Sequence, residues 1–138
     1  MKTFYGALIL TVFSWLQMTS GVLAADVNGL WFKTTSADPN NITIFYHENG
    51  ALQAIGYSTL QDRKILWYAT GEIKEFRMRL SYHYNVNAMP PGWEPDGKMD
   101  LSIADDGNTI AGAATAASGS WSGKIEFKRI QIVSPQLE

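Results

Sequence analysis

EFRMRLSYHY, residues Glu75 to Tyr84, alternates apolar and polar side chains along its length. Successive side chains of an extended strand point to opposite faces, so the alternation divides this run into an apolar face and a polar face. The pattern predicts a β-strand with one buried side and one exposed side. The side chains expected on the buried side are Phe76, Met78, Leu80, Tyr82 and Tyr84.

Two other runs repeat this alternation over shorter lengths, from Lys98 to Ala104 and from Lys124 to Lys128. Further stretches alternate less regularly but are rich in aromatic and β-branched residues, which favour strands. Together these runs predict about eight strands. The less regular candidates are Leu30 to Thr34, Asn41 to Glu48, Leu52 to Leu60, Lys64 to Ala69, and Thr109 to Ala117.

Several segments between the predicted strands contain residues that favour tight β-hairpin turns. Asn49-Gly50 tolerates the positive φ values of a tight two-residue turn, and Asp105 to Asn108 forms a second turn cluster. No helical apolar stripe follows the first 24 residues. We therefore expect an all-β fold, a single antiparallel up-and-down barrel, because closure removes the exposed edges of a sheet.

The first 24 residues have the grammar of a secretory signal peptide. Lys2 supplies a positive charge, Phe4 to Leu16 is uncharged and mostly apolar, and Val22-Leu23-Ala24 offers small residues for cleavage. The apolar run is shorter than the roughly 20 residues of a spanning helix. We expect cleavage to leave one β-barrel domain, residues 25–138, as an exported protein that is periplasmic or secreted and has no membrane attachment.

Composition narrows the classes of partner. After the expected cleavage, ten Lys and Arg stand against thirteen Asp and Glu, a net charge of −3. A weakly acidic chain without basic clusters argues against nucleic acid and anionic membranes as partners. The chain has no cysteine, so packing alone must hold the exported domain together.

No catalytic or metal-binding constellation emerges. Residues 119–123, GSWSG, resemble a nucleophile elbow but carry Trp121 where that motif requires serine. The only histidines, His47 and His83, are flanked by strand residues, and we expect both to face solvent. We expect no enzymatic activity, no cofactor and no metal. Asn41-Ile42-Thr43 is a formal glycosylation sequon that otherwise begins a strand.

One connection, Asn85 to Gly97, is long for a hairpin and holds three prolines. Its Met89 and Trp93 either close a barrel end as a plug or gate a ligand. The small side chains of residues 110–117 leave a filled and a hollow interior both open. If the interior is hollow, aromatic side chains can line it. The candidate ligand-binding residues are Trp67, Tyr82, Tyr84, Met89 and Trp93.

Gly29 and Trp31 in the first strand and Arg129 in the last strand resemble the lipocalin signature. The tail segments 106–108, 119–123 and 127–129 are also similar to the ends of small exported lipocalin-like (calycin-type) domains. The resemblance implies a barrel in which the arginine covers the tryptophan at the closed end. The chain lacks a Thr-Asp-Tyr motif and the C-terminal helix of true lipocalins.

Two functions follow as expectations. The first is an exported, non-enzymatic binding protein that holds a small apolar ligand in the barrel mouth under the 85–97 loop. The alternative is a protein-interaction or inhibitor module, with a protein partner and a filled barrel. The two differ in whether the interior is hollow.

Overall fold

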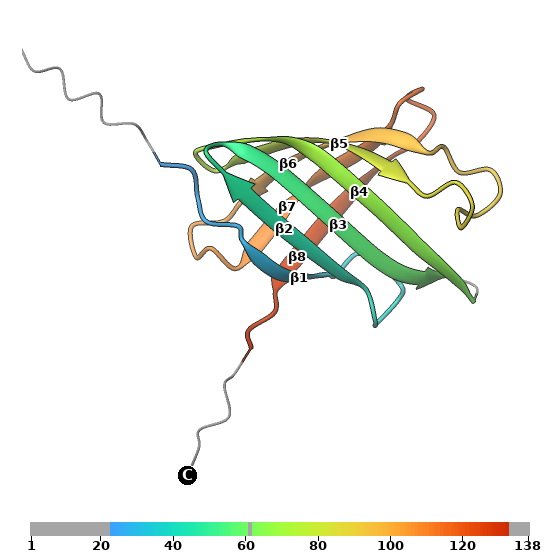
Figure 1. Ribbon diagram of the computed structural model, residues 1–138, viewed down its shortest axis with the longest axis horizontal. Coiled ribbons are helices and arrows are strands. Elements are labelled where there is room, and N and C mark those ends of the chain that lie inside the picture. Colours follow the sequence, from blue (N-terminus) through green and yellow to red (C-terminus); the bar gives the residue numbers. More distant parts are fainter. Residues whose placement is uncertain (1–22, 61, 133–138) are drawn as a thin grey trace, which may run out of the picture.

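The computed structural model describes residues 23–60 and 62–132, so the predicted signal peptide lies almost wholly outside the described residues. Eight strands close into one antiparallel barrel in which each strand pairs with its neighbours in the sequence and β1 pairs with β8 (Figure 1). The predicted all-β, up-and-down barrel is confirmed. The strands are β1 Gly29–Lys33, β2 Ile42–Glu48, β3 Ala51–Leu60, β4 Arg63–Lys74, β5 Arg77–Tyr84, β6 Asp96–Ile103, β7 Thr109–Ala116 and β8 Ser122–Arg129.

Tight turns join most neighbouring strands. Asn49 and Gly50, with φ values of 51° and 83°, connect β2 to β3 in the left-handed conformations that a type I′ turn requires. Gly107, with φ of 70°, lies in the turn between β6 and β7. Within the described residues there is no helix long and apolar enough to cross a membrane.

The sequence reading was wrong at one end of the run that starts at Glu75. Glu75 adopts a φ of 55° and belongs to the turn between β4 and β5, and β5 begins only at Arg77. Phe76 therefore leaves the apolar face of the strand, and 51% of it is exposed. Met78, Leu80 and Tyr82 are buried as predicted, and Tyr84 is half buried against the core.

Large side chains fill the barrel at the end where Trp31 and Arg129 pair. Phe45 packs edge to face against Trp31, with 6.1 Å between ring centroids, and against Phe127, with 5.4 Å. Edge-to-face contacts of this kind add to the stabilisation from burial. Other large side chains around them are also fully buried, namely Val27, Leu52, Met78, Leu101 and Ile110.

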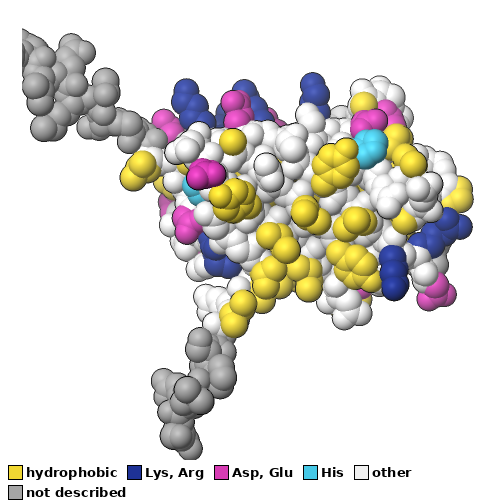
Figure 2. Space-filling view, in the orientation of Figure 1, with side chains coloured by type: hydrophobic (Ala, Val, Ile, Leu, Met, Phe, Trp, Pro, Cys, Tyr) yellow, Lys and Arg dark blue, Asp and Glu magenta, His cyan; other side chains and the backbone are white. Residues whose placement is uncertain are grey.

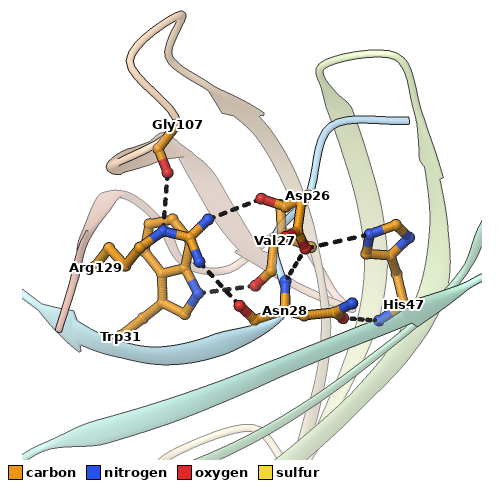
Figure 3. Close-up of polar contacts among 7 residues, drawn as sticks. All are labelled: Asp26, Val27, Asn28, Trp31, His47, Gly107 and Arg129. Atoms are coloured by element: carbon orange, nitrogen blue, oxygen red, sulfur yellow. Dashed lines mark hydrogen bonds and ion pairs between the residues drawn. The ribbon is translucent and has the colours of Figure 1, made fainter. Parts of the chain in front are cut away.

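Arg129 closes this end, as the lipocalin resemblance implies. Its Cζ lies 4.4 Å from the centroid of the Trp31 ring, and β1 and β8 pair at these two residues. The Trp31 indole donates a hydrogen bond of 2.9 Å to the Val27 carbonyl (Figure 3). Gly29, with φ of 129°, has a backbone conformation that favours glycine, and it lies beside the Arg129 guanidinium.

Candidate ligand-binding site

Two adjoining cavities open at the end of the barrel opposite Arg129, with volumes of about 200 and 270 Å³. Lys33, Tyr84 and Trp93 line both of them. The barrel is therefore filled at its closed end and hollow at its mouth. Ala116, one of the small side chains of β7, lines the larger cavity and leaves space that a large side chain would fill.

Two glycines let aromatic rings lie flat against the inside of the sheet. Gly56 of β3 pairs with Trp67 of β4, and a Cβ at this glycine would lie 2.0 Å from the indole. Gly97 of β6 pairs with Tyr82 of β5, where a Cβ would lie 2.2 Å from the phenol ring. Such distances are far below van der Waals contact, so only glycine leaves room for the two rings. The rings of Trp67 and Tyr82 form an aromatic wall inside the mouth.

The connection that was predicted over residues 85–97 spans 85–95, because β6 begins at Asp96, and its Trp93 lies beside this wall. Its ring packs edge to face against Tyr84 at 5.3 Å, and Tyr84 packs likewise against Tyr82 at 5.4 Å. These three rings form a continuous aromatic row from β5 to the loop. About 41% of Trp93 stays exposed, so the loop borders the mouth and does not seal it.

Glu94 anchors the same loop to the turn between β7 and β8. Its carboxylate accepts hydrogen bonds from the Ser118 amide at 2.7 Å, the Ser118 hydroxyl at 2.5 Å and the Ser120 hydroxyl at 3.3 Å. The two Ser118 bonds are the main reason that the pKa of Glu94 lies below its usual value. An ionised Glu94 therefore holds Trp93 beside the opening.

Lys33 brings a positive charge into the mouth. It shares the inward register of Trp31 on β1 and pairs with the buried Phe127 of β8. Burial lowers the pKa of its ammonium. Among the described residues, no carboxylate oxygen lies within 4.0 Å of this ammonium. The Asn41 side chain holds the Lys33 backbone from both sides, through bonds of 2.6 and 3.0 Å.

The tyrosines of the mouth are neutral hydrogen-bonding groups. Burial raises the pKa of Tyr84 to about 12. The pKa of Tyr82 is also raised, mainly by burial and further by the negative charges of Glu94 and Asp96. Each phenol therefore keeps its proton at physiological pH and presents both an apolar ring and a polar tip to the cavities.

Most of the predicted site residues meet in this mouth. Trp67, Tyr84 and Trp93 line the smaller cavity, and Tyr82, Tyr84 and Trp93 line the larger one. Met89 is half buried in the loop but does not line either cavity.

Sequence reasoning missed several residues of the mouth, among them Lys33 and Trp121. The signal for Lys33 was its spacing, because a residue two positions after an inward Trp31 also points inward. Trp121, which is 52% exposed beside the larger cavity, was classed only as part of a turn. A large aromatic residue among glycines and serines was the available sign.

The prediction that both histidines face solvent is wrong for His47. The His47 side chain is only 16% exposed, with its Nε2 3.7 Å from Asp26, so it does not face solvent. His83 is more open and contacts Asp96 at 2.5 Å. No group of three or more metal-ligating side chains occurs in the part of the chain that the structure describes.

The Asn41 side chain of the glycosylation sequon is buried in the fold. Its amide donates two hydrogen bonds, which leaves no room for a glycan on the folded protein.

Comparisons of the chain with protein-family models, with curated proteins and with solved structures found no match. The functional argument therefore starts from the geometry of the mouth.

Proposed function

We propose that the protein binds a small molecule with an apolar body and an anionic group at the open end of its barrel. One observation carries the proposal: Lys33, Tyr84 and Trp93 converge on both cavities of the mouth. Ligand sites are usually concave and mainly apolar, with a few polar groups that fix orientation. The larger cavity has these properties, whereas the lining of the smaller one is more polar than apolar.

The aromatic row supports the apolar part of the ligand. Tyr82, Tyr84 and Trp93 offer ring faces and edges on one side of the larger cavity, and Trp121 borders its rim. The filled core beneath limits how deeply a ligand can enter. A volume of about 270 Å³ is near the lower end of common ligand sites, which favours a molecule of two or three fused or linked rings.

Lys33 supports the anionic part. An ammonium in a partly buried site loses hydration, and a nearby negative charge compensates for this loss. The described residues supply no such charge to Lys33 within ion-pair distance. A carboxylate, sulfonate or phosphate on the ligand would supply it.

Two fluorescent probes with one skeleton test the proposal. Anilinonaphthalene sulfonate is anionic, and phenylnaphthylamine is the same ring system without the sulfonate. We expect both to bind with one site per chain, the anionic probe more tightly. Lys33→Met should weaken the anionic probe roughly tenfold and leave the neutral probe nearly unchanged, because only the charge pairing is removed.

Trp93→Ala tests whether the loop contacts a ligand or only plugs the barrel end. If the ring grips a ligand, this variant weakens both probes while its far-ultraviolet circular dichroism stays native. Unfolding of the variant would instead identify Trp93 as a structural plug. Ile55→Lys, on the outer surface of β3, is the control for probe bound outside the mouth, and native binding by this variant is expected.

A second candidate function is a protein-binding rim. Trp93 and Trp121 are 41% and 52% exposed at the same end of the barrel, and such residues are frequent in interface centres. If neither probe binds the mouth and substitution of these two residues abolishes binding of a protein partner, this alternative replaces the first.

We also propose that the protein is an exported, lipocalin-like domain. The Trp31–Arg129 contact and the closed barrel support the family resemblance, and the leader pattern of residues 1–24 supports export. Mass measurement of the secreted protein should find Ala25 or Asp26 as the first residue. A retained Met1 would contradict export by cleavage.

A further inference from the structure

The outer surface of the barrel is apolar over three neighbouring strands. Large apolar side chains that are 37–55% exposed gather in front of β2, β3 and β4 (Figure 2). We call this surface the β2–β4 face. Its residues are Ile42, Ile44, Tyr46, Ile55, Tyr57, Leu66 and Tyr68.

The register of the strands makes this face continuous. Ile44 pairs with Ile55, which pairs with Tyr68, so these three side chains form one row across the sheet. Ile42, Tyr57 and Leu66 form the adjacent row in the same way. The face ends at β5 and β6, whose outward positions are mainly charged or hydroxyl side chains. The apolar surface is therefore bounded on the side of β5.

The area of the face is close to what a stable interface needs. With about half of each side chain exposed, seven side chains of roughly 200 Å² each present roughly 700 Å². This value is slightly above the roughly 600 Å² that marks the upper limit of apolar patches on typical monomers. A standard interface buries about 800 Å² on each partner, so the face and a polar rim around it reach that size.

The charges at the two ends of the face are arranged with a two-fold relation. On β4, Glu72 lies four residues after Tyr68 and Lys64 lies four residues before it, each roughly 13 Å away along the strand. All three share the outward register. Neither Glu72 nor Lys64 forms an ion pair within the described residues. Glu72 and Lys64 are thus equally distant from the central row.

We propose that the β2–β4 face is the interface of a homodimer, with the two-fold axis along the central row Ile44, Ile55 and Tyr68. Rotation about this axis runs the strands of the two copies antiparallel. Glu72 of each copy then faces Lys64 of the other, and each residue of the central row faces its own counterpart. An axis parallel to the strands would place like charges opposite each other, which costs affinity.

Sedimentation equilibrium of the full-length product purified from expressing cells tests the dimer. We expect a concentration-dependent monomer–dimer equilibrium. Ile55→Lys should weaken the dimer roughly tenfold or more, because it places two positive charges together at the axis. Lys98→Glu on β6 lies outside the face and is the matched control, with native association expected.

A charge exchange tests the orientation. Glu72→Lys and Lys64→Glu should each weaken the dimer, because like charges then meet across the interface, and the double variant should restore it. Urea unfolding of each variant shows whether the monomer itself remains folded. A dimer that the double variant does not restore would overturn the proposed axis.

Two results would overturn the proposal as a whole. The first is a monomer at every concentration, and the second is a dimer that Ile55→Lys leaves intact. If the monomer instead binds phosphatidylcholine vesicles and Ile55→Lys abolishes this binding, a lipid surface covers the face in place of a second copy. The outcome is independent of ligand binding in the mouth.

Discussion

The Arg129 guanidinium stacks on the Trp31 indole and also ties down the backbone around it. It donates hydrogen bonds to three carbonyls, those of Asp26 at 2.7 Å, Asn28 at 2.9 Å and Gly107 at 3.0 Å (Figure 3). One side chain of β8 thereby links the segment before β1 to the turn between β6 and β7. The contact closes the end of the barrel that carries the filled core.

Removal of this side chain should destabilise the fold. We expect Arg129→Ala to lower the free energy of unfolding by about 2–4 kcal/mol, since it removes a cation–π contact and three charge-assisted hydrogen bonds. Arg129→Lys should recover only part of the loss, because an ammonium cannot reach three carbonyls in a planar fork. Urea unfolding monitored by tryptophan fluorescence measures both. Equal stability of the lysine variant and the wild type would contradict a geometric role.

The inward face of β5 provides a test of register. Leu80 is 3% exposed, and Leu80→Asp should destabilise by several kcal/mol because it buries an unpaired charge. Arg79 points outward, and Arg79→Ser should change stability little. Arg79→Asp would match the charge of Leu80→Asp but would be a poorer control. An aspartate at position 79 would lie between Glu72 and Asp100, its cross-strand neighbours, and the like charges would repel. Similar melting temperatures for the two variants would contradict the register.

The regularity of each strand explains how far the sequence could predict the fold. β5, β6 and β8 were read clearly because one face of each meets water, and their apolar and polar positions alternate. β2 and β3 alternated poorly because both of their faces are apolar, one toward the core and one on the β2–β4 face. The weak pattern was therefore a sign of the exposed surface.

The site was less predictable because it depends on closure. Tyr82 and Trp67 could be chosen by residue type, but only the barrel brings them to one mouth. Met89 was chosen for its apolar side chain in the same loop as Trp93, and loop conformation decided that only Trp93 lines the cavities. Burial of Lys33 depends on β8, which lies nearly a hundred residues further along the chain.

Gly56 should be essential for the position of Trp67. We expect Gly56→Ala to lower stability by about 1–3 kcal/mol and to change the near-ultraviolet circular dichroism, because its Cβ would overlap the indole. The neutral probe should bind more weakly to the altered mouth. In the double variant Gly56→Ala with Trp67→Leu, the smaller side chain should relieve the clash, so the two stability changes should not be additive. Additive losses would show that the clash is relieved elsewhere.

The hydrogen bonds from Ser118 and Ser120 to the Glu94 carboxylate should be lost at acid pH. Because the pKa of Glu94 is lowered in the folded state, its hydrogen bonds stabilise the loop above the unfolded pKa of 4.5 and are lost as the pH falls through the lower folded value. The Ser118 amide proton should therefore shift with a midpoint below pH 4.5 in nuclear magnetic resonance titrations. Glu94→Gln should abolish this transition. A midpoint above pH 4.5 would contradict the anchor.

Lys33 should lower the stability of the ligand-free fold while it favours an anionic ligand. Its pKa lies below the usual 10.5, so its charged form is disfavoured in the folded state, and its effect on stability becomes less adverse as the pH rises toward 10.5. We expect Lys33→Met to be more stable than the wild type by about 1 kcal/mol at neutral pH, with the difference shrinking toward pH 10.5. Lys98→Met makes the same change on the exposed face of β6 and should have little effect. Urea unfolding across this pH range measures the three proteins. A Lys33→Met variant less stable than the wild type at neutral pH would show that the folded barrel itself stabilises the ammonium, and the case for an anionic ligand group would then lose its physical basis.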